Sequence, residues 1–212
     1  MKKGKFIVIS GPSGVGKDTI CDELVKSGIG VYSVSMTTRE IRKGEVDGKD
    51  YFFVTKDVFE DKIKNNYFLE YAIYNNNYYG TPIEFVENTT NNGINVFAIL
   101  EIIGAINVKK IFKDAILIFI MPPSLDELEK RLRGRKLDSD EVINERLDIA
   151  KSEISSRDKY DYIIINNSVD EAVKEIISII NKNSWSRDKK VSTFFWRLWA
   201  SETASNVNAR CQ

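Results

Sequence analysis

A glycine-rich stretch near the amino terminus carries residue types that bind polyphosphates. Gly11, Gly14 and Gly16 follow the apolar run 6–9 closely, and Lys17 opens a segment with helical spacing. Glycines let the backbone turn its N–H groups inward onto phosphate oxygens, the following helix adds the positive end of its dipole, and the lysine reaches the outer phosphates. We therefore predict that a nucleoside triphosphate binds here. The predicted triphosphate-binding residues are Gly11, Pro12, Ser13, Gly14, Val15, Gly16, Lys17, Asp18 and Thr19.

One position of this loop departs from the usual pattern, which has Ser or Thr directly after the lysine to hold Mg²⁺. Asp18 stands there, and Thr19 follows one place later. Two interpretations stay open: either Thr19 supplies the hydroxyl ligand, or phosphates and water hold the metal, an arrangement that Mg²⁺ tolerates. Mg²⁺ is the expected cofactor in both, with Thr19 as the candidate protein ligand.

A second group of polar residues lies in the turn-rich segment 33–51. Arg39, Arg42 and Tyr51 fall within it. A guanidinium binds a phosphate through two parallel hydrogen bonds, and a tyrosine hydroxyl adds a third donor to the same oxygens. These residue types suit a phosphate monoester, although the charges taken alone also fit a solvated loop.

The composition excludes several functional classes. The chain has 31 basic and 31 acidic residues, so no net charge draws it to nucleic acid or to an anionic membrane. It has no histidine, which removes the commonest general base, the commonest zinc ligand and Ser-His-Asp chemistry. Phosphoryl transfer loses little by this, because its transition state needs mainly positioning and positive charge.

The apolar segments are short. The longest, residues 115–121, cannot span a bilayer, and residues 6–9 cannot serve as the core of a signal peptide. Two distant cysteines, Cys21 and Cys211, fit reduced thiols better than a disulfide framework. We expect a cytoplasmic protein with neither a nucleic-acid nor a membrane partner.

Strand-like runs alternate with helical patterns along the chain, which predicts a parallel sheet wrapped by helices. At 212 residues with 42% hydrophobic content, one compact domain is the simplest expectation. The predicted strands cover residues 6–10, 95–101, 115–121 and 160–165, and the predicted helices cover 17–26 and 105–112.

Three later helix starts carry capping boxes, in which a side-chain oxygen caps the backbone and a glutamate follows three residues later. The last of these helices is predicted to end near Asn181. The pairs are Ser124 with Glu127, Asp138 with Glu141, and Ser168 with Glu171.

Two regions differ from this pattern. The segment 32–79, rich in tyrosine and charge, is predicted to form a small inserted lobe that overhangs the phosphate loop and holds a second substrate. The tail from Ser184 onward contains all three tryptophans. Either an amphipathic docking helix or a disordered extension would account for it, and both interpretations stay open.

The loop and the arginine-rich segment, together with four further motifs, occur in an order that closely resembles the guanylate kinase family. The resemblance runs from about Lys5 to Asn181. The further motifs are Phe-Leu-Glu-Tyr-Ala at 68–72, Asn-Tyr-Tyr-Gly-Thr-Pro at 77–82, Pro-Pro-Ser-Leu at 122–125 and Arg-Leu-Arg-Gly-Arg at 131–135.

The resemblance implies an α/β fold of the P-loop NTPase type, a parallel sheet wrapped by helices with a small inserted GMP-binding lobe and a helical lid. It implies that the γ-phosphoryl group of ATP passes to GMP, giving ADP and GDP. The implied guanylate kinase-like domain covers residues 5–182, with the lobe at 33–82, the lid at 131–150 and a tail of unknown role at 184–212.

The resemblance also implies a role for individual residues. In the GMP set, Glu70 faces the guanine, where a carboxylate accepts from N1–H and the 2-amino group, and adenine has neither donor. Arg131 and Arg135 are expected to meet ATP from one face of the lid helix, because they are four residues apart. The implied GMP-binding residues are Ser35, Arg39, Arg42, Tyr51, Glu70, Tyr79, Thr81 and Glu101, and the implied catalytic residues are Lys17, Arg39, Arg135 and Arg146.

The chain departs from the family pattern near residue 100. The family usually has two acidic residues, separated by one position, before a Gly-Ala turn, and an ungapped alignment on Gly104 and Ala105 puts Ile99 and Glu101 there. A shift of two residues would instead make Glu101 the first acid. Both alignments stay open.

Two other functions remain as alternatives. Ribose-bisphosphate kinases resemble this fold and also carry Lys-Asp at the end of the loop, but Glu70 and Thr81 supply a base-reading edge that a sugar phosphate does not need. A non-catalytic binding module would not need the triphosphate loop, whereas this loop keeps Lys17. The sequence leaves open whether the chain forms a homodimer.

Overall fold

The computed structural model describes residues 3–134 and 138–182 of the chain. Arg135 and the tail predicted over 184–212 therefore lie outside the described residues. The strands are β1 (Phe6–Ser10), β2 (Val31–Tyr32), β3 (Met36–Thr37), β4 (Phe52–Phe53), β5 (Phe68–Tyr74), β6 (Asn77–Pro82), β7 (Val96–Ile99), β8 (Ile116–Met121) and β9 (Tyr162–Ile165). The helices are α1 (Lys17–Lys26), α2 (Lys56–Lys64), α3 (Ile83–Asn91), α4 (Ile102–Ile111), α5 (Leu125–Gly134), α6 (Asp140–Ser155) and α7 (Val169–Asn181), with a 3₁₀ turn at Arg157–Lys159.

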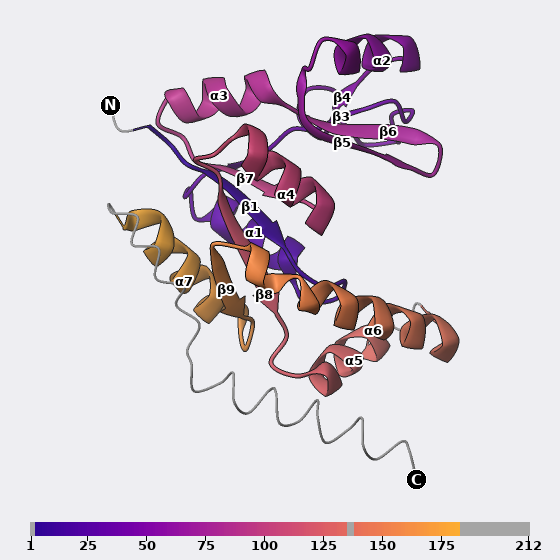
Figure 1. Cartoon of the computed structure of the whole chain (residues 1–212), viewed down its shortest axis with the longest axis vertical. Helices are drawn as coiled ribbons and strands as arrows, with labels where there is room; N and C mark the ends of the chain where they lie inside the picture. Colours follow the sequence, from indigo (N-terminus) through magenta and orange to yellow (C-terminus); the bar gives the residue numbers. More distant parts are fainter. Residues whose placement is uncertain (1–2, 135–137, 183–212) are drawn as a thin grey trace.

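A parallel sheet of five strands, in the order β2-β7-β1-β8-β9, forms the centre of the molecule (Figure 1). The middle strand β1 is buried along its whole length, which explains its unbroken apolar run up to Ser10. Because all five strands are parallel, their carboxyl ends lie at one edge of the sheet. The segments that follow β1, β7 and β9 therefore start at that shared edge, where open α/β sheets bind their ligands.

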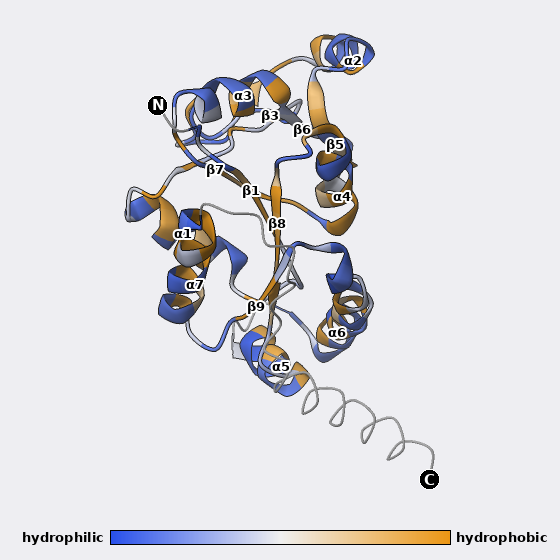
Figure 2. Cartoon of the chain, turned by 60° about the vertical axis from the view of Figure 1, so that its left-hand side comes forward, coloured by the Kyte–Doolittle hydropathy of each residue, from blue (hydrophilic) through white to orange (hydrophobic). Residues whose placement is uncertain are grey.

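The strands bury alternate side chains on opposite faces of this sheet. Ile7 and Ile9 pack into a cluster with residues of α1 and α7. Phe6 and Val8 point the other way, into a cluster with residues of α3, α4 and α6. Figure 2 shows the same layering, with apolar strands between helices whose outer surfaces are hydrophilic. The predicted parallel sheet wrapped by helices is confirmed.

A second sheet, in the order β4-β3-β6-β5, lies at one end of the molecule together with α2 (Figure 1). It has its own small apolar core, in which the ring of Phe59 stacks on Phe68 at 4.3 Å and on Tyr78 at 5.1 Å. The hairpin between β5 and β6 turns at Asn75 and Asn76, which have φ angles of 47° and 61°. Asparagine tolerates this left-handed conformation better than most residues.

Helices α5 and α6 pack against each other at the opposite end of the molecule (Figure 1). Their contact buries Leu128 and Leu132 from α5 against Ile143 and Ala150 from α6. None of the helices within 3–134 and 138–182 combines the length and apolar content that crossing a bilayer requires.

Most of the predicted elements are present with bounds close to those expected. The strand at 6–10 and the helix at 17–26 have the predicted bounds. The helix predicted at 105–112 instead begins at Ile102 and continues through Gly104, a residue type that disfavours helix interiors and so hid the true start.

The capping predictions are confirmed at two of three sites. The Ser124 hydroxyl accepts from the N–H of Glu127 at 3.1 Å, and the Ser168 hydroxyl accepts from the N–H of Glu171 at 3.3 Å. The prediction for Asp138 is wrong, because Ser139 occupies the N-cap position of α6. The Asp138 carboxylate instead pairs with the guanidinium of Arg146.

The stacked rings around Phe59 generate a stability prediction. Phe59 is fully buried, so Phe59→Ala should lower the free energy of unfolding by about 3–5 kcal/mol. Val58→Ala, at the exposed neighbouring position of α2, should change it by less than about 1 kcal/mol. Urea unfolding of the two variants measures both values. Equal losses for the two would contradict this view of the small core.

Candidate active site

The phosphate loop between β1 and α1 leaves no room for side chains at two of its glycines. A Cβ atom on Gly11 would lie 2.2 Å from the carbonyl oxygen of Ile120, and one on Gly16 would lie 2.7 Å from Nδ2 of Asn166. Gly16 also has a φ of 99° and forms the N-cap of α1. The loop conformation therefore requires glycine at both positions.

Lys17 lies against the loop that it is predicted to serve. Its Nζ donates to the carbonyl oxygens of Gly11 at 2.6 Å and Pro12 at 3.0 Å. These bonds hold the ammonium over the loop at the first residue of α1, where the helix N-terminus also favours negative charge. The loop therefore combines backbone N–H groups, a helix end and a lysine at one place.

Asn166, which was not predicted, ties this loop to the end of β9. Its Nδ2 donates to the carbonyl oxygen of Val15 at 2.7 Å, and only 4% of the residue is exposed. Its backbone oxygen accepts from the guanidinium of Arg131 at 3.1 Å. Its position directly after the predicted strand 160–165 was the only signal in the sequence, because it places the side chain at the edge of the sheet that carries the loop.

Two of the predicted lid arginines lie close to the loop, and each is held by a carboxylate. Arg146 on α6 donates to the hydroxyl of Ser13 at 2.6 Å and pairs with Asp138. Arg131 on α5 pairs with Glu127 at 3.0 Å. Arg146 therefore reaches the phosphate loop directly, whereas Arg131 reaches it through Asn166.

Glu70 on β5 and Thr81 on β6 are brought together as the GMP set predicts. The Thr81 hydroxyl donates to Oε1 of Glu70 at 2.8 Å. Burial raises the pKa of the Glu70 carboxyl, hydrogen bonds from Thr81 oppose the rise, and the charge of Glu101 adds to it. A Cβ on Gly104 would lie 3.2 Å from Oε2 of Glu70, so the carboxylate lies against the first turn of α4.

Three of the residues predicted to bind the GMP phosphate, Arg39, Tyr51 and Tyr79, lie together. The Arg39 guanidinium lies 5.5 Å from the centre of the Tyr51 ring, and the Tyr51 and Tyr79 rings meet edge to face at 6.0 Å. The Arg42 side chain is exposed. Ser35, which is partly buried, accepts at its backbone oxygen from the N–H of Phe52 at 2.9 Å.

A carboxylate that was not predicted, Glu45, forms a two-bond ion pair with Arg39. The shorter contact is 2.7 Å. Hydrogen bonds from Arg39 and from the Arg42 backbone lower the pKa of Glu45 to about 2. The same ion pair raises the pKa of Arg39 further above its usual range, and Tyr79 adds to the rise. No local sequence pattern distinguishes Glu45 from the other acidic residues of segment 39–50.

Oxygen donors near the phosphate loop fit Mg²⁺ that is held mainly by phosphates and water. Asp18 and Thr19 are both exposed on the first turn of α1. Glu153 on α6 has a buried Oε2 with no hydrogen-bond partner among the described residues. Burial raises the pKa of this carboxyl, and the nearby charge of Lys17 only partly opposes the rise. In the described ranges no three acidic, cysteine or histidine side chains gather into a cage.

The class of protein that fits this arrangement is a P-loop nucleoside monophosphate kinase. Such an enzyme combines a triphosphate-type loop on a parallel sheet with arginines and tyrosines of a separate small lobe and arginines from a packed helix pair. The chain matches the guanylate kinase family over residues 3–183. A guanylate kinase from Oceanobacillus iheyensis is 47% identical over 189 residues, which cover 89% of this chain and 92% of that protein. The crystal structure of guanylate kinase from Anaplasma phagocytophilum has a TM-score of 0.62 and 32% identity, covering 84% of this chain and 85% of that one. The chain belongs to the guanylate kinase family.

The raised pKa of Glu70 predicts a pH-dependent stability difference. Folding favours the protonated carboxyl, so this group makes wild-type stability fall as the pH rises from the ordinary glutamate pKa of about 4.3 through the raised folded value. Glu70→Gln removes this titration. The stability of Glu70→Gln relative to wild type should therefore be more favourable at pH 7 than at pH 3.5.

Urea unfolding at the two pH values measures this difference, with Glu87→Gln on the exposed side of α3 as the control. A relative stability of Glu70→Gln that does not change with pH would contradict the raised pKa.

Proposed function

We propose that this chain transfers the γ-phosphoryl group of ATP to GMP, giving ADP and GDP, and so recycles GMP in purine metabolism. The observation that carries the proposal is the partly buried Glu70 carboxylate, hydrogen-bonded at 2.8 Å by Thr81 and set against α4, in a molecule that also has the phosphate loop. A buried carboxylate needs donors, and the Watson–Crick edge of guanine offers two of them side by side. Adenine has neither donor, so AMP would leave the charge unpaired.

On the GMP side, the base and the phosphate use different parts of the small lobe. Glu70 and Thr81 face the guanine, with Glu101 at the start of α4 as the third residue there. The phosphate meets guanidinium and hydroxyl donors of the same lobe, which fix the attacking oxygen by charge-assisted bonds. This phosphate group consists of Ser35, Arg39, Arg42, Tyr51 and Tyr79.

On the ATP side, residues 11–19 cradle the phosphates through their backbone N–H groups. Lys17 exchanges its carbonyl partners for oxygens of the outer phosphates and follows the charge that develops during transfer. Arg146 already bonds to Ser13 in the loop, so it needs little movement to reach the transferring group. Arg131 and Arg135 complete the positive charge from the lid.

Mg²⁺ fits the oxygen donors at the start of α1, with the Thr19 hydroxyl as the protein ligand. Bound there, it would neutralise phosphate charge and help to orient the transferring group. The chain's own residues then position ATP, hold the GMP oxygen in line and exclude water once the lid closes.

The proposal also covers the domain organisation of the chain and the cellular compartment of the enzyme. The core runs over residues 5–182, with the GMP-binding lobe at 33–82 and the lid at 131–150. The small-molecule substrates are ATP and GMP, and the enzyme acts in the cytoplasm without nucleic-acid or membrane partners.

Acceptor specificity tests the proposal directly. With ATP and Mg²⁺, GMP should exceed AMP, UMP and ribose 1,5-bisphosphate in kcat/KM by roughly 10⁴-fold, the range seen when a site hydrogen-bonds a substrate group. Glu70→Gln should raise KM for GMP by roughly 10- to 100-fold, the value of one or two charge-assisted bonds, and leave KM for ATP unchanged.

A coupled ADP-release assay measures these constants, with Glu87→Gln as the exposed control. Faster turnover of ribose 1,5-bisphosphate would favour the sugar kinase alternative. Absence of any ATP-dependent turnover would favour the binding module.

The lid arginines generate a separate prediction. Arg146→Ala should lower kcat by roughly 10³-fold or more, because arginine charge on a transferring phosphoryl group has that value in related enzymes. Arg133→Ala is the matched control, since Arg133 on α5 pairs with Glu129 at 2.8 Å and with Asp140, away from the loop. Steady-state rates at saturating ATP and GMP compare the two, and equal losses would remove Arg146 from the mechanism.

A further inference from the structure

Glu45 lies beside the predicted GMP phosphate group without belonging to it, and its contacts with Arg39 are unusually complete. Arg39 NH1 donates to Oε2 of Glu45 at 2.9 Å, and NH2 donates to Oε1 at 2.7 Å. NH1 also donates to the backbone oxygen of Glu40 at 2.7 Å. Two parallel bonds to one carboxylate fix the plane of the guanidinium as well as its position.

These contacts use some donors of Arg39 and leave others. A guanidinium has five N–H groups. Three of them go to Glu45 and Glu40, which leaves, of the bonds described, the Nε–H and one N–H of NH2. These two groups point along one edge of the guanidinium, in the spacing that binds two oxygens of a phosphate. Glu45 therefore does not use the edge that a phosphate needs.

The surroundings hold that edge in place. The Tyr51 and Phe53 rings lie 5.5 and 5.6 Å from the guanidinium carbon of Arg39. The Tyr79 ring in turn meets the Tyr51 ring edge to face at 6.0 Å. Only 12% of the Arg39 side chain and 21% of the Glu45 side chain are exposed, so solvent competes weakly for the pair.

The same carboxylate also shapes the backbone at the second arginine. Oε2 of Glu45 accepts from the N–H of Arg42 at 2.7 Å, and the N–H of Glu45 donates to the carbonyl oxygen of Arg42 at 3.1 Å. Gly44 turns the chain between them with a φ of 96°. One side chain thus determines the orientation of Arg39 and the turn that carries Arg42.

We propose that Glu45 is a positioning residue of the GMP phosphate subsite: it orients Arg39 so that the Nε and NH2 edge is ready for a phosphate monoester, and it sets the turn from which Arg42 reaches the same phosphate. The inference rests on the proposed function, because it needs GMP as the acceptor. Glu45 does not touch GMP in this arrangement. If Glu45 instead competed with the phosphate for Arg39, replacing Glu45 would strengthen GMP binding.

Calorimetric binding of GMP and of guanosine tests this role in the full chain. Glu45→Gln loses the charge and presents an N–H group where the carboxylate accepted, so it should weaken GMP binding by about 10-fold or more, the loss expected for one charged interaction. Guanosine has no phosphate, so its affinity should stay within about twofold of wild type on the same reasoning. Glu45→Asp keeps the charge but shortens the side chain, so its affinity for GMP should lie between those of wild type and Glu45→Gln.

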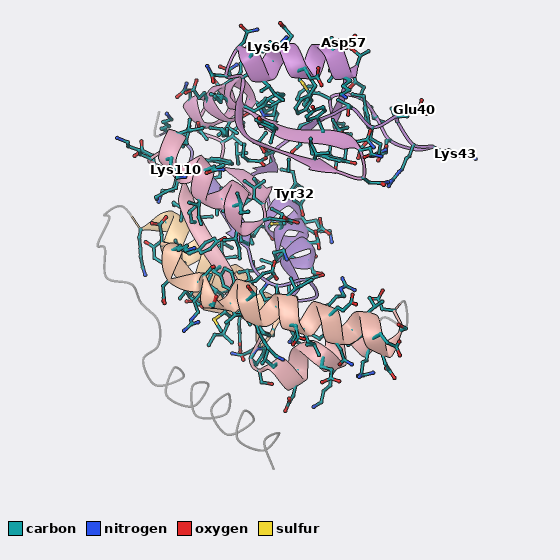
Figure 3. The ribbon with its side chains drawn as sticks, turned by 45° about the vertical axis from the view of Figure 1, so that its right-hand side comes forward. Tyr32, Glu40, Lys43, Asp57, Lys64 and Lys110 are labelled. Atoms are coloured by element: carbon teal, nitrogen blue, oxygen red, sulfur yellow. The ribbon has the colours of Figure 1, made fainter. Side chains whose placement is uncertain are left out.

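Two further variants separate positioning from general damage to the lobe. In an Arg39→Ala background, Glu45→Gln should change GMP affinity by less than about threefold, since most of its effect runs through Arg39. Glu40→Gln is the matched control, because Glu40 contacts Arg39 only through its backbone and its exposed side chain lies at the outer edge of the lobe (Figure 3). It should leave GMP affinity unchanged, and thermal unfolding of each variant checks that the lobe is folded.

Each contrary outcome has a definite meaning. Tighter or unchanged GMP binding by Glu45→Gln, with a wild type that binds GMP, overturns the positioning role and leaves the proposed function standing. Equal losses of affinity for guanosine and for GMP also overturn it, because they would show a structural effect on the whole lobe. The same holds if Glu45→Gln lowers GMP affinity by as much in the Arg39→Ala background as in wild type. A wild type that binds neither GMP nor guanosine overturns both the proposed function and the role of Glu45.

Discussion

The structure depends on a loop that must pass from β1 into α1 with no space for a side chain at Gly11 or Gly16. The carbonyl oxygen of Ile120 lies where a Cβ of Gly11 would be, and Asn166 occupies the equivalent space beside Gly16. Strands β7 and β8 pair with β1 on its two sides, and β1 is buried along its whole length. The packing of the sheet therefore constrains the conformation of the loop at these two glycines.

Three arginines of the predicted substrate-binding sites are each held by a carboxylate of the protein itself. Arg39 is held by Glu45, Arg146 by Asp138 and Arg131 by Glu127. Paired arginines keep a defined direction, and partial neutralisation limits their mutual repulsion. Donors oriented in advance in this way would favour phosphoryl transfer, which depends mainly on positioning and positive charge.

Local patterns predicted the fold well and the polar network poorly. The apolar run at 6–10 and the helical spacing at 17–26 are properties of neighbouring residues, and the structure has both elements with those bounds. The family resemblance implies that Glu70 and Thr81 both face the guanine, and the Thr81 hydroxyl donates to the Glu70 carboxylate at 2.8 Å. Asn166 was missed because its partner Val15 is 151 positions away. Asp138 was misassigned as a helix cap, since a capping box and an ion pair to Arg146 use the same residue type.

Phosphorus NMR of ATP, GMP and Mg²⁺ with the full chain tests the central claim most directly, because it follows the transferred phosphoryl group itself. The account predicts that the γ signal of ATP declines while ADP and GDP appear in equal amounts, without accumulation of inorganic phosphate. Formation of ADP and inorganic phosphate with GMP left unchanged would contradict it.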